Sequence, residues 1–463
     1  MSVTTSQFWD KVCGSTISNP PTEATLVRPP RVPSVMPCVV AIAGLIIEGL
    51  RPILIGALLT APLLSATAQT RRLLLILAAF VIPVMLWMRS RYHVGGREIN
   101  PGIYGNFNNS SLSSAKRIER ALNRAVDKYR PTPYLFNGHL RTIVPHILMH
   151  GSAPPHGLRR RWLPVDGQHI GLDILLPSDI VCPRGVLVLL HGLNGGSTES
   201  YVVDMYKACE ERGYVACCML GRGLAGTPFT GGPKDTFCPS RVSDVSSVIN
   251  MFHTSCPGLP VHLAGWSLGG VVAANVVAKC GSELKGVLTS CVVVSGGLRV
   301  WEIFDSRCAV ELWHPLLAFE LKRSLLWRMV SLTGYEPQHD NWYYSCTNLL
   351  EVETALVAPA HGFDSVWDYY RAMSADDEGK CRDITVPTLI VHAADDPVIH
   401  VDSAGPKPTE EAHDLCEYLF AIITETGGHV GWPQGYMPWQ GGFSWISNTA
   451  IDFADATLPH QTY

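Results

Sequence analysis

The stretch that most constrains the fold is a serine between two glycines, placed where an apolar run gives way to a helical pattern. Residues 261–264 are mostly apolar, residues 265–269 read Gly-Trp-Ser-Leu-Gly, and residues 271–274 are small and apolar. This order predicts a strand, a sharp turn and a helix, with Ser267 exposed at the end of a buried sheet. The glycines remove Cβ atoms that would clash in so tight a turn. We therefore expect Ser267 to be a nucleophile.

The chain around this turn alternates apolar runs with helical patterns. Continuous apolar runs are typical of buried parallel strands, and helical crossovers imply a sheet covered on both faces. The expected strands are Val186–Leu190, Tyr214–Leu220, Val261–Ala264, Val287–Val294, Thr388–Val391 and Leu419–Ile423, with helices near 198–211, 242–253, 268–280 and 364–374. A hairpin with an Asp-Gly turn is expected at 162–176. The pattern predicts an α/β fold with a mostly parallel sheet over 131–455.

The ends of the predicted strands carry the other candidate site residues. His191-Gly192 follows the first strand, and we expect the backbone N–H groups of Leu193 and Leu268 to stabilise a developing oxyanion. His191 itself is interpreted as shaping that loop. Two adjacent candidates for the acid that orients a catalytic histidine, Asp395 and Asp396, follow a later strand.

His429 lies on a Gly-rich loop after the last predicted strand and is the candidate general base. Its position completes the chain order serine, acid, histidine that this strand–turn–helix motif requires. His392 and His400 flank the acid and are interpreted as structural. Structural roles are also favoured for Arg222, which is expected to pin neighbouring loops, and for Asp244 at a helix start.

The N-terminal quarter predicts a membrane anchor. The chain is 47% hydrophobic and only 16% charged. Residues 1–34 are polar and Pro-rich and are expected to lack fixed structure. Residues 35–90 hold three uncharged runs, which predict an anchor of one or two transmembrane helices. The apolar region starts too late and is too long for a cleaved signal peptide. Residues 91–130 are interpreted as a linker.

Composition excludes several other classes. The net charge is −4 with acids and bases well mixed, which gives no electrostatic basis for a nucleic-acid partner. The 14 cysteines form no C-x-x-C pair and show no metal-ligand spacing, so we expect neither a metal nor an organic cofactor. An aromatic-rich insertion at about 298–363 suggests either a helical lid that forms an acyl pocket or a packed layer without substrate contact. We favour the lid because the insertion would sit over Ser267.

Several further short motifs occur in one order along residues 131–448. They are His139-Leu140-Arg141-Thr142, the 191–197 loop, Gly221-Arg222-Gly223, Ser243-Asp244, Phe363-Asp364 and Ala394-Asp395-Asp396-Pro397. With them the chain resembles the AB hydrolase superfamily and, within it, the AB hydrolase 4 family of membrane-anchored lipases, phospholipases and medium-chain acyl-ethanol transferases. The resemblance implies an α/β-hydrolase fold and a triad of Ser267, Asp396 and His429. It departs from the family at Arg141, where glutamine is usual, and at Leu220, where asparagine is usual.

The resemblance implies a serine carboxylester hydrolase that cleaves lipid acyl esters through an acyl-enzyme. A lipid ester and a membrane are then the expected partners, and the endoplasmic reticulum is the candidate location. Two alternatives stay open. Acyl transfer to a small alcohol would use the same acyl-enzyme. A non-catalytic lipid-binding protein of this fold would need no triad.

Overall fold

The computed structural model describes residues 3–20, 99–108, 111–149, 153–178, 180–337, 340–405 and 416–458, together with residues 55, 57, 78–79 and 81–83. Within this part a nine-stranded sheet has the strand order β1-β9-β8-β7-β6-β4-β5-β3-β2. The strands are β1 (Gly102–Tyr104), β2 (Arg159–Val165), β3 (Gln168–Leu175), β4 (Val186–Leu190), β5 (Val215–Leu220), β6 (Val261–Trp266), β7 (Ser290–Val294), β8 (Thr388–Ala393) and β9 (Leu419–Thr424).

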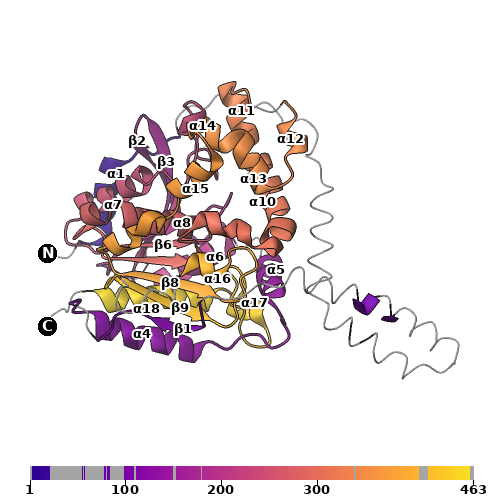
Figure 1. Cartoon of the computed structure of the whole chain (residues 1–463). Helices are drawn as coiled ribbons and strands as arrows, with labels where there is room; N and C mark the ends of the chain where they lie inside the picture. Colours follow the sequence, from indigo (N-terminus) through magenta and orange to yellow (C-terminus); the bar gives the residue numbers. More distant parts are fainter. Residues whose placement is uncertain are drawn as a thin grey trace.

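Strands β4 to β9 are parallel, and β1, β2 and β3 pair antiparallel at the two edges. The helices of the domain are α1 (Thr5–Ser15), α4 (Ala115–Lys128), α5 (Gly138–Met149), α6 (Ser200–Arg212), α7 (Ser243–Ser255), α8 (Leu268–Lys279), α9 (Gly281–Leu284), α15 (Val366–Ala372), α16 (Val401–Ala404), α17 (Pro438–Gly441) and α18 (Ser444–Thr457). The expected mostly parallel sheet with helices on both faces is confirmed (Figure 1).

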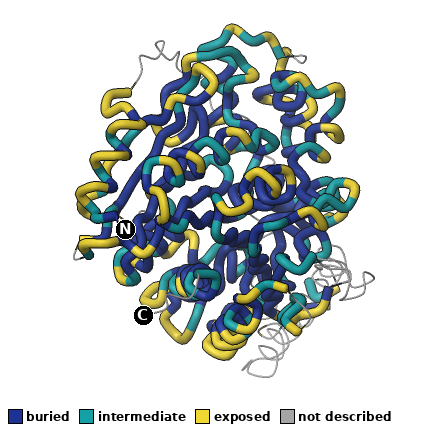
Figure 2. The backbone as a smooth tube through the Cα atoms, turned by 90° about the vertical axis from the view of Figure 1, so that its left-hand side faces the viewer, coloured by how far each residue is buried: buried dark blue, intermediate teal, exposed yellow. Residues whose placement is uncertain are grey.

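The sheet is buried on both faces, which explains why its central strands are apolar throughout. Val186, Val188 and Leu190 of β4 pack with α1, α7 and α8, whereas Leu187 and Leu189 pack with α4, α6 and α18. Successive residues of a strand point to opposite faces, so a strand covered on both sides needs apolar residues at every position. Figure 2 shows these buried segments as a continuous interior inside partly exposed helices.

The β2–β3 hairpin turns where the sequence predicts. Asp166 and Gly167 have φ values of 51° and 73°. Two successive left-handed residues match the twist of the flanking strands, as in a type I′ turn.

The structure differs from the expectation that residues 1–34 lack fixed structure. Residues 5–15 form α1, which begins with a capping box at Thr4. Phe8 and Val12 are completely buried, and Phe8 stacks on Phe252 of α7 with ring centroids 5.8 Å apart. Burial of these two side chains stabilises a helix that would be marginal alone. Residues 21–34 lie outside the described residues.

The region 91–130, expected to be a linker, contains two elements of the domain. Residues 102–104 form β1, which pairs with β9 at the sheet edge. Residues 115–128 form α4, which buries Ile118, Ala121, Leu122 and Ala125 against the domain. These positions follow helical spacing, so the element was readable as an amphipathic helix.

The expected membrane anchor at 35–90 lies almost entirely outside the described residues. Among the helices that the structure describes, none combines the length and the apolar character needed to cross a bilayer.

The insertion between β7 and α15 is helical. Its segments are η2 (Val300–Asp305), η3 (Ala309–Trp313), α10 (His314–Leu321), η4 (Lys322–Leu326), α11 (Trp327–Thr333), α12 (Trp342–Ser345), α13 (Leu349–Val352), η5 (Glu353–Val357) and α14 (Ala358–Ala360). They share a core of their own that includes Leu325, Trp342, Tyr343 and Leu356. Figure 1 shows α10 to α14 stacked together beyond one end of the sheet. Most of the insertion is therefore a packed helical layer.

A buried acid makes this layer sensitive to pH. Glu353 accepts a hydrogen bond of 2.5 Å from Tyr370 Oη, and burial raises the pKa of Glu353 to about 7. The folded state binds the carboxyl proton of Glu353 more tightly than the unfolded state does. Protonation of Glu353 therefore stabilises the fold fully below pH ~4.5, and this contribution is lost as pH rises through about 7.

We expect Glu353→Gln to keep the Tyr370 hydrogen bond and to remove this loss, so that the variant exceeds wild type by about 3 kcal/mol above pH 8. Thermal unfolding from pH 4 to pH 9 measures the difference. Glu320→Gln, at an exposed position of α10, is the control. Equal pH slopes in wild type and Glu353→Gln would contradict the assignment.

Candidate active site

Ser267 occupies a strained turn between the centre of the sheet and α8. Its φ and ψ are 55° and −120°, and its amide donates to the carbonyl of Val294 at 2.9 Å. A Cβ atom on Gly265 would collide with the carbonyl of Gly269, and one on Gly269 would collide with the carbonyl of Leu190. Only glycine fits at these two positions, which is why the sequence pattern predicts the turn.

The three residues of the predicted triad lie together. His429 Nε2 is 2.7 Å from Ser267 Oγ, and His429 Nδ1 is 2.8 Å from Asp396 Oδ2. In this arrangement Nδ1–H donates to the carboxylate, which leaves Nε2 free to accept the hydroxyl proton of Ser267. The loops after β6, β8 and β9 supply the three side chains, because the carboxyl ends of these parallel strands lie at one edge of the sheet.

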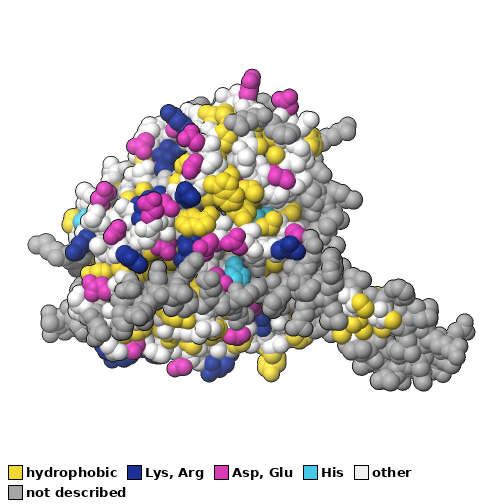
Figure 3. All heavy atoms as spheres, in the orientation of Figure 1, with side chains coloured by type: hydrophobic (Ala, Val, Ile, Leu, Met, Phe, Trp, Pro, Cys, Tyr) yellow, Lys and Arg dark blue, Asp and Glu magenta, His cyan; other side chains and the backbone are white. Residues whose placement is uncertain are grey.

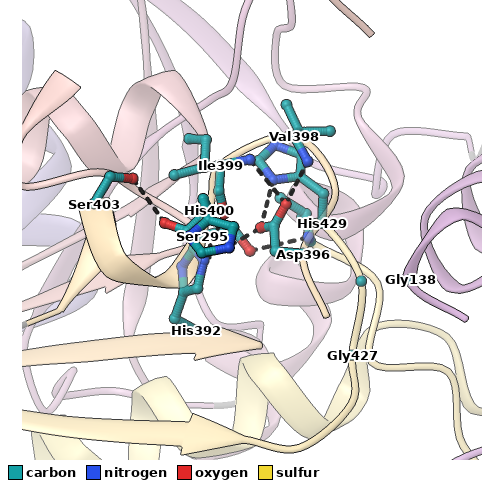
Figure 4. Close-up of polar contacts among 12 residues, drawn as sticks. Gly138, Ser295, His392, Asp396, Val398, Ile399, His400, Ser403, Gly427 and His429 are labelled. Carbon is teal, nitrogen blue, oxygen red and sulfur yellow. Dashed lines mark hydrogen bonds and ion pairs between the residues drawn. The ribbon is translucent and has the colours of Figure 1, made fainter. Parts of the chain in front are cut away.

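Asp396 is fully buried and is held as an acceptor from two directions (Figure 4). Its Oδ1 accepts from the amides of Val398 and Ile399 at 2.9 and 3.0 Å, while Oδ2 faces His429. Burial by itself would raise the pKa of Asp396, but His429 and these hydrogen bonds outweigh it and hold the pKa below its usual range. The carboxylate therefore stays ionised beside the histidine down to acidic pH.

Asp395 has a different position and holds the histidine loop. Its Oδ1 accepts from the amides of Gly427 and Gly428, both at 2.8 Å, and its Oδ2 pairs with Arg141 Nη1 at 2.8 Å. Burial raises the pKa of Asp395 against the opposing influence of Arg141. Of the two adjacent acids, the structure thus brings Asp396 and not Asp395 to His429.

Two side chains that had no assigned role in the sequence also position His429. Thr142 Oγ1 accepts from the His429 amide at 2.8 Å, and Ser295 Oγ accepts from the Val430 amide at 3.0 Å. Thr142 belongs to the 139–142 motif, which marked the segment as informative, whereas no local pattern distinguishes Ser295. Val430 has a φ of 56°, so the loop needs these contacts to hold a β-branched residue in the left-handed region.

The two predicted oxyanion donors belong to segments that adjoin Ser267. Leu268 is the first residue of α8, where amides have no partner within the helix. Leu193 lines the cavity that contains Ser267 and His429. His191 shapes this loop through a 2.8 Å contact between its Nδ1 and the carbonyl of Gly192, and burial lowers the pKa of His191, so the ring is neutral.

The remaining polar residues of these loops have structural contacts. Arg222 Nε donates to Asp244 Oδ2 at 2.9 Å within a buried pair that joins the loop after β5 to α7. His392 is buried with its Nε2 2.9 Å from the carbonyl of Ile399, and His400 Nδ1 lies 3.2 Å from Asp402. Arg222, Asp244, His392 and His400 thus make the structural contacts expected of them.

Above Ser267 lies an apolar cavity of about 330 Å³. Its walls come from α5, the loop after β4, the insertion and the loops after β8 and β9. The lining residues are Thr142, Ile143, His146, Ile147, Gly192, Leu193, Glu199, Tyr201, Ser267, Trp313, Leu316, Leu317, Val398, His429, Val430 and Phe443. Trp313 is held over the site because its Nε1 donates to His139 Nδ1 at 3.2 Å. The insertion therefore combines a packed layer with a short segment, Trp313 to Leu317, that reaches the site.

Comparison with known proteins identifies the family to which the chain belongs. The family model described as serine aminopeptidase, S33, matches residues 181–415, a little more than half of the chain. The chain belongs to the AB hydrolase superfamily. The predicted resemblance to the AB hydrolase 4 family is thereby confirmed.

Curated relatives have low sequence identity to this chain but align with most of its length. Human phospholipase ABHD3 is 26% identical over 72% of this chain and 80% of its own length. The putative esterase YheT of Escherichia coli is 28% identical over 65% of this chain and 85% of its own length. A monoacylglycerol lipase ABHD2 of Danio rerio is 25% identical over 71% of this chain and 79% of its own length. Among solved structures, a Pyrobaculum calidifontis esterase aligns with a TM-score of 0.42 at 12% identity, over 74% of this chain and 94% of that one.

The two adjacent acids predict different consequences when each is neutralised. Asp396→Asn favours the wrong histidine tautomer, so we expect the rate of fluorophosphonate labelling of Ser267 to fall by about 10⁴. Asp395→Asn leaves the Asp396–His429 contact in place but removes the charge that pairs with Arg141. We expect a smaller loss of labelling, below ~10², and a stability loss of about 3 kcal/mol.

Labelling rates and thermal unfolding of both variants at one pH test this assignment. A larger loss of labelling in Asp395→Asn, at a temperature where both variants are folded, would reverse the two roles.

Proposed function

We propose that the protein is a serine carboxylester hydrolase that cleaves lipid acyl esters through an acyl-enzyme. The observation that carries this proposal is the hydrogen-bonded series Ser267–His429–Asp396 on the floor of an apolar cavity. Ser267 Oγ attacks the acyl carbonyl as His429 takes its proton, and the resulting oxyanion lies toward the amides of Leu193 and Leu268. His429 then returns the proton to the leaving alcohol, and water resolves the acyl-enzyme by the same steps.

The lining of the cavity supports an acyl chain as the group that is bound. Ile143, Trp313, Leu316, Leu317 and Val398 offer apolar contacts beside the serine. An apolar chain placed there is removed from water, which supplies binding energy in proportion to the area buried. The names of the relatives, which are phospholipase, esterase and monoacylglycerol lipase, support the same substrate class.

Ser267→Ala removes the nucleophile, and we expect it to abolish fluorophosphonate labelling and the hydrolysis of acylglycerol and glycerophospholipid esters. Ser345→Ala, an exposed serine of α12, is the control, and equal melting temperatures show that both variants fold. Turnover that persists in Ser267→Ala would refute the mechanism. A wild-type protein whose serine is not labelled and that hydrolyses no ester would favour the lipid-binding alternative.

Analysis of the products with and without added ethanol separates hydrolysis from acyl transfer. An aminoacyl nitroanilide as substrate tests peptidase activity.

We further propose that the apolar region 35–90 anchors the enzyme in a membrane and crosses it an even number of times. The two segments that flank this region both pack on the hydrolase domain. Before it, Ile17 and Trp162 exchange backbone hydrogen bonds of 2.9 and 3.0 Å. After it, the Ile99 amide donates to Asp402 at 3.0 Å and β1 pairs with β9. A segment that starts and ends on one folded domain must leave the bilayer on the side where it entered.

Epitope tags at the two ends of the chain test this topology in sealed membrane vesicles. We expect a protease added outside the vesicles to remove both tags or neither, because α1 and α18 belong to one domain. Detergent-permeabilised vesicles, in which both tags are accessible, are the control. Removal of one tag and protection of the other would indicate an odd number of crossings.

A further inference from the structure

Exposed apolar side chains concentrate in two segments beside the cavity. In the described part of the chain, twelve large hydrophobic residues are exposed, and seven of them come from residues 134–148 and 436–439. These seven, which we call the α5–α17 patch, are Tyr134, Phe136, Ile147, Leu148, Tyr436, Met437 and Trp439. The exposed fraction reaches 67% at Ile147 and 77% at Tyr436. The other five are scattered singly, as is normal for a protein surface.

The two segments of the patch are in contact with each other. Tyr134 Oη donates to the carbonyl of Tyr436 at 2.8 Å, and α17 packs against α5. Figure 1 shows α5 and α17 side by side on one flank of the molecule. Exposed apolar side chains gathered on two segments that pack together usually mark an interaction site.

The patch continues into the active-site cavity. Ile147 is both a member of the patch and part of the lining, and Ile143 and His146 carry the lining along the same helix toward Ser267. An apolar molecule that lies on the patch can therefore reach the cavity along α5, where the polar residues of this helix in the lining are His146 and Thr142. Because the patch leads into the cavity, the partner that binds the patch is expected to be the source of the substrate.

The charge of the patch suits a phospholipid surface. Residues 130–149 and 426–451 contain no aspartate or glutamate. Arg130 is exposed beside the patch, and its carbonyl accepts from the Gly435 amide at 3.0 Å. Elsewhere acidic and basic side chains are interspersed, as on the face drawn in Figure 3. Segments that are apolar, free of carboxylates and rich in Tyr and Trp are typical of the boundary between lipid headgroups and acyl chains.

We propose that the α5–α17 patch docks on the surface of a lipid bilayer and that ester substrates pass from the bilayer along α5 into the cavity. This inference rests on the proposed function for the passage of substrate, whereas the docking itself requires only the surface. Tyr436, Met437 and Trp439 enter the headgroup region, and Ile147 lies at the mouth of the cavity.

Quenching of tryptophan fluorescence tests the docking without reference to catalysis. The full chain is reconstituted in phosphatidylcholine vesicles with or without brominated acyl chains, which quench tryptophans at the membrane. We expect Trp439→Phe to reduce the quenched part of the fluorescence, whereas Trp367→Phe leaves it unchanged. Trp367 is a matched control, because it is 47% exposed on α15 and Trp439 is 51% exposed. Equal quenching in wild type and Trp439→Phe would overturn the proposal.

Kinetics of the double variant Tyr436→Ser/Trp439→Ser test the passage of substrate. Neither residue lines the cavity, so hydrolysis of water-soluble p-nitrophenyl acetate is expected to be unchanged. The apparent KM for an ester embedded in vesicles is expected to rise about tenfold, since two apolar contacts with lipid are lost. The matched double variant Tyr344→Ser/Trp367→Ser, on the insertion and α15, should change neither value.

The outcomes separate the possible failures. If wild type hydrolyses neither ester, the proposed function fails, while the quenching result still decides the docking. If wild type hydrolyses both and the double variant has an unchanged KM, the passage is refuted. If wild type sediments as a dimer that the double variant splits, with no difference in quenching, a second copy of the chain covers the patch and the proposal is wrong.

Discussion

The backbone of Ser267 is the constraint on which the site depends. A residue with a side chain is held in a left-handed turn, because the strand before it and the helix after it meet without room for Cβ atoms at Gly265 and Gly269. Such a conformation costs of order 1–3 kcal/mol and persists only where its surroundings enforce it. The turn lies at the end of β6, between β4 and β7 in the middle of the sheet. The loops that follow the neighbouring strands are thereby brought around one hydroxyl group.

The polar groups around this hydroxyl act in two connected sets. Asp396 contacts the histidine ring, and Asp395 and Thr142 hold the backbone of the same loop. Although the two acids are adjacent in the chain and both are buried, their surroundings shift their pKa values in opposite directions. The charged form is favoured where a histidine and two amides receive it, and is disfavoured where burial outweighs the pairing with Arg141. The different roles of Asp395 and Asp396 thus follow from their contacts and not from their residue type.

Much of the domain could be predicted from the sequence, because its central strands are buried on both faces and therefore apolar at every position. The order of Ser267, the acids and His429 was likewise readable, since each follows a predicted strand. The choice of Asp396 over Asp395 came from family resemblance, because nothing local separates two adjacent acids. No local pattern identified Ser295.

Other parts depend on contacts that no local pattern contains. Strand β1 has three residues and exists through its pairing with β9, and α1 exists through burial of Phe8 against α7. The aromatic insertion was predicted as a unit, but only its fold decides that, of its many aromatic residues, Trp313 lines the cavity. Helix α4 is an exception, because its helical spacing is visible in the sequence although residues 91–130 are predicted to be a linker.

Helix α1 also imposes an order on the assembly of the molecule. Phe8 is synthesised more than two hundred residues before its stacking partner, Phe252. Since chains are synthesised from the N-terminus at roughly 5–20 residues per second, the apolar face of α1 waits for tens of seconds without its partner. During that interval the segment lacks the contacts that stabilise it as a helix. Helix α1 can therefore dock on the domain only after α7 has been synthesised.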